Sequence, residues 1–285
     1  PQPTLQRFTL INFLKDQLPD SLINYNKKVT QINYEAENIE VIFENNVSIK
    51  CDYLIISDGS FSKTKSLIAK RDIKPKYFNS VALRATINKN DLQGIDSNNI
   101  SLSLGSNLHT VSYPVDNKGE VNFVSILRKK LSSKEFSDHS LFESKDFIFS
   151  ILSEISKQVD PDIIKNLKNI RCFPIFVSSE IYQPTNKNTF LIGDAFFALP
   201  PTFAQGASQS IEVAYELYKN LEKGNIPFNL GRIKRTKMID NKSKFNYFAF
   251  HLSSPLIIWI RNLLMKQLVK NEKFINSYLG KIYKN

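Results

Sequence analysis

One stretch constrains the fold more than any other: a short apolar strand that stops at Gly-Asp and is followed by two prolines and a long helix. It reads TFLIGDAFFALPPTFAQGAS and covers Thr189–Ser208. Ligands of open α/β sheets bind at the carboxyl ends of the strands. Asp194 is therefore placed to accept hydrogen bonds from a ligand hydroxyl, close to a helix start whose first N–H groups carry partial positive charge.

A purely structural interpretation of the same stretch is that Asp194 caps a helix. The long helix is expected to open at Gln205-Gly206, roughly ten residues later, which is too far for an ordinary cap. Gly193 permits unusual backbone dihedrals and a close approach, and Pro200-Pro201 fixes a rigid turn. The pattern therefore favours a ligand site over a cap.

A second strand ends in the same way, in the segment DYLIISDGSFSKTKSL. The continuous apolar run Tyr53–Ser57 predicts a parallel strand that is buried on both faces. It stops at Asp58-Gly59, although Asp-Gly is also one of the commonest turn pairs. Together with Asp194, it gives two carboxylates at strand ends that could face one extended cofactor.

The rest of the chain predicts a mixed α/β (α+β) fold, in which a nucleotide-binding layer is interrupted by an antiparallel sheet. The predicted domains are a partial dinucleotide-binding domain over 1–70, a substrate-binding sheet over 71–180, a second part of the first domain over 181–224, and C-terminal helices over 225–285. The predicted elements are a helix over 4–18, short strands over 28–50, an antiparallel sheet over 77–128, an interrupted helical segment over 146–169, a helix over 204–222, and helices from 230 with a break at Pro255.

Composition excludes several classes of protein. The chain has 285 residues and a net charge of +11, but no nucleic-acid recognition motif, so the lysines are assigned to solvated faces. No apolar run is long enough to span a bilayer. Two cysteines and three unclustered histidines argue against a metal site and favour a reducing cytoplasm.

Several motifs together resemble one family, the single-component FAD-dependent aromatic monooxygenases. These include salicylate and hydroxybenzoate hydroxylases and the related hydroxylases of ubiquinone biosynthesis. The late motif Gly-Asp-Ala-Ala-His, prolines, Gly-Gln-Gly is similar to GDAFFALPPTFAQGAS, and the middle motif Asp-Gly-x-x-Ser-x-x-Arg is similar to DGSFSKTK. The matches also include RFTL, RIKR, HTVSYPV and EVNFV, in the family's order.

The resemblance implies roles for individual residues. Asp194 would bind the ribitol of FAD, and Gly193 and Ala195 would line its pyrophosphate. The isoalloxazine ring would be bordered near the start of the long helix, while the middle motif would support FAD and the passage of NAD(P)H. The implied cofactor residues are Arg7, Asp58, Gly59, Gly193, Asp194, Ala195, Pro200, Gln205, Gly206 and Ala207, and the substrate candidates are Arg84, His109, Tyr113 and Pro201.

The resemblance also implies a reaction. NAD(P)H would reduce the flavin, dioxygen would add, and a flavin C4a-hydroperoxide would hydroxylate a small phenolic ring. The alternatives are a ubiquinone-pathway hydroxylase acting on a prenylated phenol, or a non-catalytic fragment or scaffold with the same fold. A halogenase is not favoured, since the only tryptophan, Trp259, lies outside that family's signature. No catalytic base can be assigned.

The departures from the family pattern matter as well. Phe197 replaces a histidine, Ala204 stands where a glycine is common, and Lys65 replaces an arginine, which keeps the charge but loses bidentate geometry. No G-x-G-x-x-G motif occurs, and the first residue is Pro1. We therefore expect this to be a piece of a longer protein, inactive if it acts alone.

The C-terminal segment KFNYFAFHLSSPLIIWIRNLLMKQLVK mixes bulky apolar residues with lysines. The favoured interpretation is a helix packed over the substrate domain, and the alternative is an interfacial patch that touches a membrane. The expected partners are thus an aromatic substrate and dioxygen, with peripheral membrane contact and a homodimer as further expectations. The expected location is cytoplasmic, with peripheral contact at the inner membrane face.

Overall fold

The computed structural model of the chain describes residues 7–92, 96, 98–115, 119–223, 229–278 and 280, and the side chains of residues 7, 229 and 230 lie outside the description. The chain divides into two compact units. Unit 1 contains residues 1–22, 77–175 and 247–285, and unit 2 contains 23–76 and 176–246. The C-terminal helices thus group with the large sheet. The functional labels of the four predicted domains stay predictions.

Unit 2 begins with a three-stranded antiparallel sheet of β1 (Val29–Tyr34), β2 (Ile39–Phe43) and β3 (Ser48–Cys51). Every second residue of β2 is buried, which is the alternation that a one-sided sheet needs. At the β2–β3 turn, Asn46 adopts a positive φ of 59°, a conformation that asparagine tolerates. The short strands predicted over 28–50 are confirmed.

A parallel pair of strands follows, formed by β4 (Leu54–Ile56) and β10 (Thr189–Leu191). The predicted parallel strand is therefore confirmed, but its predicted burial on both faces is wrong. Ile56 is buried, whereas Ile55 is 45% exposed. The reason is that no layer of the described residues covers the face on which Ile55 lies.

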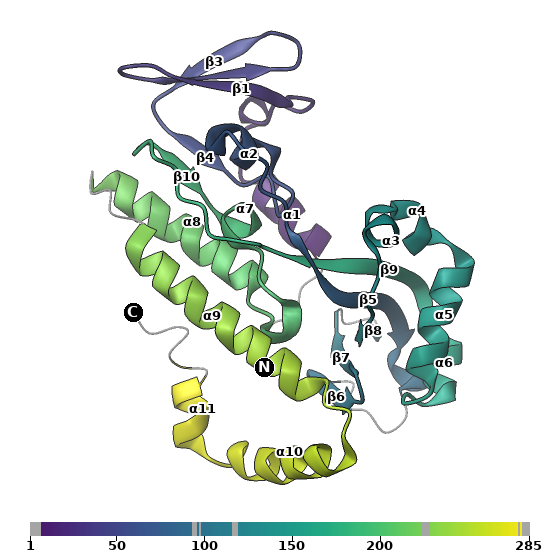
Figure 1. The fold of residues 1–285 in the computed structure, drawn as a ribbon. Helices are drawn as coiled ribbons and strands as arrows, with labels where there is room; N and C mark the ends of the chain where they lie inside the picture. Colours follow the sequence, from purple (N-terminus) through teal and green to yellow (C-terminus); the bar gives the residue numbers. More distant parts are fainter. Residues whose placement is uncertain are drawn as a thin grey trace. The chain divides into compact units, whose positions relative to one another are not determined.

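Helices surround the parallel pair within unit 2. They are α2 (Lys63–Ala69), α7 (Gly193–Phe197), the 3-10 turn η3 (Pro201–Phe203), α8 (Gly206–Glu222) and α9 (Asn229–Phe250), whose last four residues belong to unit 1. The residues Val213 and Leu217 of α8 pack against Phe190 of β10. Ile211 lies on another side of α8 and is 58% exposed. Helix α9 runs alongside α8 (Figure 1).

Unit 1 is built on a five-stranded sheet in the order β6-β7-β8-β5-β9. The pairs β5–β8, β6–β7 and β7–β8 are antiparallel, so the predicted antiparallel sheet is confirmed. The strands are β5 (Lys76–Asn88), β6 (Ser101–Gly105), β7 (Leu108–Pro114), β8 (Glu120–Arg128) and β9 (Lys168–Val177).

One face of this sheet carries the main core of unit 1. Leu83 of β5 and Phe123 of β8 are fully buried there, and they belong to one cluster with Ile151 and Ile155 of α5. The covering helices are α3 (Ser133–Ser137), α4 (His139–Glu143), α5 (Lys145–Ser156) and α6 (Pro161–Asn166). The break predicted near Pro161 is confirmed, since Pro161 opens α6.

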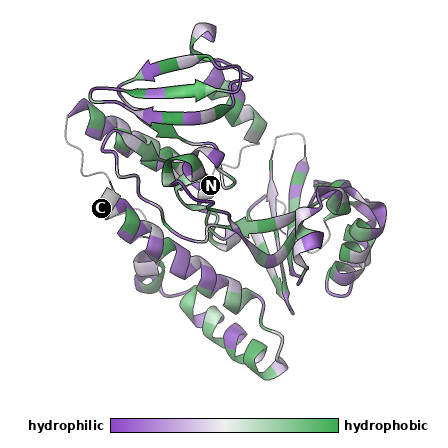
Figure 2. Cartoon of the chain, turned by 45° about the horizontal axis from the view of Figure 1, so that its top comes forward, coloured by the Kyte–Doolittle hydropathy of each residue, from purple (hydrophilic) through white to green (hydrophobic). Residues whose placement is uncertain are grey.

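The remaining elements of unit 1 are α1 (Arg7–Lys15), η1 (Asp20–Leu22), η2 (Lys89–Asp91), α10 (Pro255–Leu268) and α11 (Glu272–Tyr278). The break predicted at Pro255 is confirmed, because this proline begins α10. Hydrophobic residues dominate α10 (Figure 2). Even so, none of the helices in the described part of the chain has the length and apolar character needed to cross a membrane.

Candidate functional site

The two acidic strand ends meet at one edge of unit 2. In the parallel pair, Leu191 lies opposite Ile56, and the Ile192 N–H donates to the Ile56 carbonyl over 3.0 Å. Because the carboxyl ends of parallel strands share an edge, Asp58 and Asp194 follow at the same place. Both side chains are exposed. The structure therefore places both residues that the sequence singled out at the same edge of the parallel pair.

The chain turns into helix as soon as β10 ends, which the sequence did not predict. Gly193 has a φ of +58°, a left-handed conformation that favours glycine, and it begins α7. Asp194 lies in the first turn of this five-residue helix. We expected the chain to run from Asp194 into the proline turn. Five residues are too few for a helical period to be visible in the sequence.

Asp58 has a structural task of its own. Its Oδ2 accepts a hydrogen bond from the Thr64 N–H over 3.3 Å, and the Ser62 hydroxyl oxygen caps the same helix through the Lys65 N–H. The turn interpretation of Asp-Gly is thus partly right. Gly59 adopts a φ of +87°, and a Cβ placed there would meet no atom within 4 Å. The backbone at this strand end is therefore open to a ligand.

Lys65 connects the middle motif with the late one. Its side chain is buried, and its Nζ donates to the Ala195 carbonyl over 3.0 Å. Burial lowers the pKa of Lys65, against the opposing attraction of Asp58 and Glu180. Ala195 is itself fully buried, and its methyl group packs in the apolar cluster with Ile56 and Leu191. Only the backbone of Ala195 could therefore contact a cofactor.

The start of α8 is open. Gln205 is its N-cap residue, yet no side chain caps the helix. Gly206 and Ala207 are exposed, and a Cβ added to Gly206 would meet nothing within 4 Å. The preceding Ala204 holds a φ of +50°, at the position where the family often has glycine. The first N–H groups of α8 are therefore accessible to an acceptor from outside the chain.

The prolines before α8 differ from one another. Pro200 is buried, so it shapes the turn from within, whereas Pro201 is exposed at the start of η3. Phe197, in place of the family's histidine, is half-buried among the apolar residues around α7. An imidazole function at this position is absent.

A small pocket lies between the end of β10 and the start of α8. A Cβ at Gly193 would lie 3.2 Å from the Ser210 hydroxyl, which shows how closely α7 approaches the first turns of α8. The residues that line the pocket come from α7, α8 and α9 and the segment after α7: Gly193, Asp194, Phe196, Phe197, Leu199, Gly206, Gln209, Ser210, Val213, Arg232 and Thr236.

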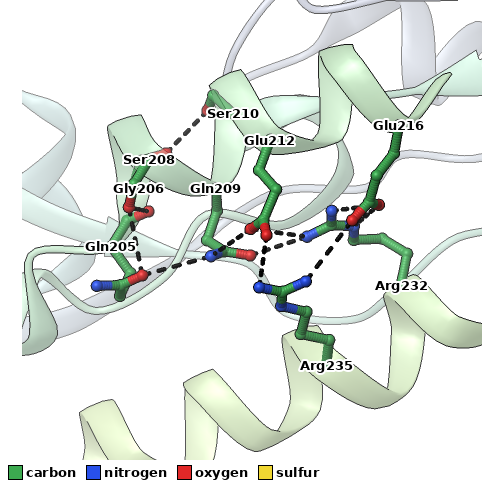
Figure 3. A network of polar contacts seen from close by, with 9 residues as sticks. All are labelled: Gln205, Gly206, Ser208, Gln209, Ser210, Glu212, Glu216, Arg232 and Arg235. Carbon is green, nitrogen blue, oxygen red and sulfur yellow. Dashed lines mark hydrogen bonds and ion pairs between the residues drawn. The ribbon is translucent and has the colours of Figure 1, made fainter. Parts of the chain in front are cut away.

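Two arginines of α9 pair with two glutamates of α8, and Arg232 also lines the pocket (Figure 3). The Arg232 Nε donates to Glu216 over 3.1 Å, and Arg232 forms a second, shorter contact with the same carboxylate. Arg235 pairs with Glu212 and reaches Glu216 over 3.6 Å. Because only 3% of the Arg232 side chain is exposed, this network fixes α9 against α8.

Gln209 extends this network to the N-terminus of α8. Its Oε1 accepts from Arg232 Nη1 over 2.8 Å, and its Nε2 donates to the Gln205 side-chain oxygen over 3.3 Å. Sequence reasoning assigned no role to Gln209 or Glu216. The available signal was the RIKR match in α9, whose two arginines lie one helical turn apart and require acidic partners.

The three sheet candidates share one face in unit 1. Arg84 and Val111 both lie opposite Val124, and Tyr113 lies opposite Asn122. Directly paired residues point to the same side, and residues two apart along a strand do as well, so Arg84, His109 and Tyr113 all lie on the face away from the main core. Arg84 is exposed, and the Tyr113 hydroxyl accepts a hydrogen bond from Asn122 over 2.6 Å.

His109 is buried on that face rather than presented to a ligand. Its Nδ1 lies 3.0 Å from His251 Nε2, and His251 Nδ1 lies 2.9 Å from the Tyr247 carbonyl. His251 Nε2 also lies 3.1 Å from the Ile126 carbonyl, so each ring nitrogen of His251 faces a backbone acceptor. Burial lowers the pKa of His109 to about 3, and it lowers the pKa of His251 as well.

Arg7 begins α1, but its side chain lies outside the described residues. No group of three potential metal ligands occurs in the described ranges, and both cysteines are free there. Burial raises the pKa of the Cys172 thiol to about 12.

Comparison with known proteins supports the motif analysis. The chain is 23% identical over 244 residues to one salicylate hydroxylase of Pseudomonas putida and 24% identical over 259 residues to another, covering 77% and 81% of this chain. These regions span 54% and 58% of the relatives, so the chain corresponds to little more than half of their length. No family model matches the chain.

Among solved structures, Klebsiella pneumoniae HpxO complexed with FAD and uric acid has a similar fold. The TM-score is 0.74 at 17% identity, and the likeness covers 98% of this chain and 72% of that one. The mixed α/β fold is therefore confirmed. So is the resemblance to FAD-dependent aromatic monooxygenases that the motifs predicted.

Proposed function

We propose that this chain carries FAD-binding and substrate-binding parts of an NAD(P)H-using monooxygenase that hydroxylates a small phenolic ring with dioxygen. One observation supports the proposal above others: the strand ends at Asp58 and Asp194 lie at one sheet edge, next to the uncapped start of α8. The relatives named salicylate hydroxylase, and a neighbour complexed with FAD and uric acid, support an aromatic substrate.

The residues present fit FAD. The exposed Asp194 carboxylate would accept hydrogen bonds from ribitol hydroxyls, and the open backbone at Gly206 and Ala207 would donate to the pyrimidine edge of the flavin ring. Bound FAD would supply the electron transfer and the activation of dioxygen. The N-terminus of α8 would stabilise negative charge on the ring, and Gln209 and Arg232 would keep that helix end in position.

The pyrophosphate of FAD would need donors that these 285 residues do not supply as a G-x-G-x-x-G loop. Within the described residues β4 pairs with β10 alone, so the other edge of this parallel sheet has no strand beside it. We therefore propose that a further strand, carrying such a loop, pairs beside β4 in the full gene product. This strand would complete both the sheet and the cofactor site.

For the substrate we propose the sheet face of unit 1 that presents Arg84 and Tyr113. The Arg84 guanidinium lies over the ring of Phe173, with 5.7 Å between its Cζ and the ring centroid, so it is oriented by the sheet. A guanidinium binds a carboxylate through two parallel hydrogen bonds. This favours a phenolic acid. A substrate contact of Pro201 stays a prediction. His109 could contact a substrate only after its hydrogen bond with His251 is broken.

The test uses the full gene product loaded with FAD. Salicylate and related phenolic acids should stimulate NAD(P)H oxidation and yield a hydroxylated product. Arg84→Met should raise KM by about tenfold or more for a phenolic acid and leave phenols without a carboxylate unaffected, since it removes a charge-assisted contact. If no phenol is hydroxylated by the flavin-loaded protein, the proposed reaction is wrong.

A second candidate substrate is a prenylated phenol delivered from a membrane. The observation that favours it is the exposed apolar side of α10 in unit 1. We therefore also propose peripheral membrane contact through the C-terminal helices. A prenylated phenol that is turned over better than salicylate in the presence of vesicles would support this candidate. The homodimer stays a prediction.

A further inference from the structure

Helix α10 turns its apolar side to solvent. Arg261 is buried, and its Nη1 donates to the Ala249 carbonyl of α9 over 3.2 Å. A water-facing helix normally has the opposite arrangement, with its charged residues outside. The large apolar residues on the outer side are 42% to 67% exposed: Leu256, Ile257, Trp259, Ile260, Leu263 and Leu264.

These outer residues form one continuous stripe. Leu256, Ile260 and Leu263 follow one another at spacings of four and three, so their side chains stack along one side of the helix. No part of the described chain covers them. Single exposed apolar residues are ordinary on a protein surface, but a contiguous stripe of six marks an interaction surface.

The charge around the stripe selects the kind of partner. From His251 to Asn271 the chain contains Arg261, Lys266 and Lys270 but no acidic residue. Both lysines are exposed beside the stripe, where their stems can lie along apolar groups while the ammonium groups reach phosphates. A second copy of the chain would bring these lysines against one another, whereas an anionic lipid surface would neutralise them.

We infer that the outer face of α10 docks on an anionic lipid bilayer, with the helix lying in the interface and Trp259 at the level of the headgroups. The inference deepens the proposed membrane contact and rests on it, but it does not depend on flavin chemistry. The apolar stripe supplies insertion into the interface, and Lys266 and Lys270 supply the preference for anionic lipid.

Trp259 is the only tryptophan of these 285 residues and lies in the stripe, so the difference in emission between the full gene product and its Trp259→Phe variant reports this surface. The full gene product is mixed with vesicles of phosphatidylcholine, with or without phosphatidylserine, and lipid binding is measured by sedimentation. We expect binding to the phosphatidylserine vesicles, a blue shift of the emission and quenching by brominated lipid. Leu256→Glu with Leu263→Glu should weaken binding by about a hundredfold or more. Lys266→Gln with Lys270→Gln should weaken it roughly thirtyfold.

Phe149→Glu is the matched control, because Phe149 is an exposed apolar residue on α5 of the same unit. It should leave vesicle binding unchanged. The inference is overturned if the emission does not respond to either vesicle, if phosphatidylcholine alone binds equally well, or if Phe149→Glu weakens binding as much as the α10 variants. It is also overturned if Leu263→Glu converts a dimer into a monomer, since a second copy would then cover the stripe. Measuring flavin-free protein in parallel separates these outcomes from a failure of the proposed hydroxylation.

Discussion

Replacing Arg232 with methionine should destabilise the contact between α8 and α9 while keeping most of the side chain's volume. The guanidinium is 3% exposed and contacts both Glu216 and Gln209. Breaking a fully buried ion pair by removing one partner costs about 3–5 kcal/mol. Glu216 is 32% exposed and keeps its contact with Arg235, so part of that penalty is relieved. We therefore expect a loss of about 2–3 kcal/mol in the free energy of local unfolding.

The assay is amide hydrogen exchange of α8 and α9, because the chain forms two units and a single global transition need not report on one contact. Exchange through local opening should be roughly 30- to 150-fold faster in Arg232→Met, which is the same free energy expressed as a ratio. The exchange rate of Arg232→Lys should lie between those of Arg232→Met and the wild type, since lysine keeps the charge but cannot form two parallel hydrogen bonds.

Lys219→Met is the matched control. Lys219 pairs with Glu222 on the same helix, but the two side chains are 43% and 50% exposed. An exposed pair of this kind contributes no more than about 0.5 kcal/mol. If Arg232→Met accelerates exchange no more than Lys219→Met does, then the buried arginine does not hold the two helices together, and the reasoning fails.

Two further predictions concern the backbone before α8 and the buried histidine pair. Ala204→Gly should raise the free energy of unfolding by about 0.5–1 kcal/mol, because an alanine at positive φ is strained and a glycine is not. Gly193→Ala should lower the free energy of unfolding by about 1–2 kcal/mol for the same reason. Urea unfolding measures both changes, and equal stability of Ala204→Gly and the wild type would contradict the first prediction. His109 has a pKa of about 3 in the folded chain against 6.5 in the unfolded one, so the unfolded chain binds more protons between these values, and stability should fall as the pH drops below about 6.5. His109→Phe should flatten that pH dependence, and an unchanged slope would show that the buried imidazole is not responsible.

Much of the site follows from local sequence. The two apolar runs predict parallel strands, because a strand that is covered on both faces needs no alternating polar residues. Gly193-Asp194 and Asp58-Gly59 then mark where these two strands end. Ile55 shows the limit of that rule. Its run is apolar, yet the residue is exposed, since the run itself does not show whether another layer covers that face of the sheet.

Other features were present in the sequence but were not used. Helix α3 opens with a capping box, in which the Ser132 side chain and the Glu135 carboxylate satisfy each other's backbone N–H groups. That signal spans only four residues and competes with the common occurrence of serine and glutamate in loops. Helix α3 can therefore be recognised from the folded structure but not from this short sequence signal.

The histidine pair could not have been predicted. His109 and His251 are 142 residues apart in the chain, and neither has a local pattern that points to the other. Tertiary packing decides such contacts, because the end of α9 and the strand β7 meet only in the folded unit. For the same reason, His109 was expected to contact substrate when it instead pairs inside the protein.

The most direct test of the central claim is the affinity of the full gene product for FAD, measured by the change in flavin fluorescence on binding. Asp194→Ala should weaken FAD binding by about tenfold to a hundredfold, because it removes a charge-assisted hydrogen bond to the ribitol. Asp52→Ala, at an exposed position between β3 and β4, should leave the affinity unchanged. FAD binding as tight in Asp194→Ala as in the wild type would contradict the assignment of this strand end to the flavin.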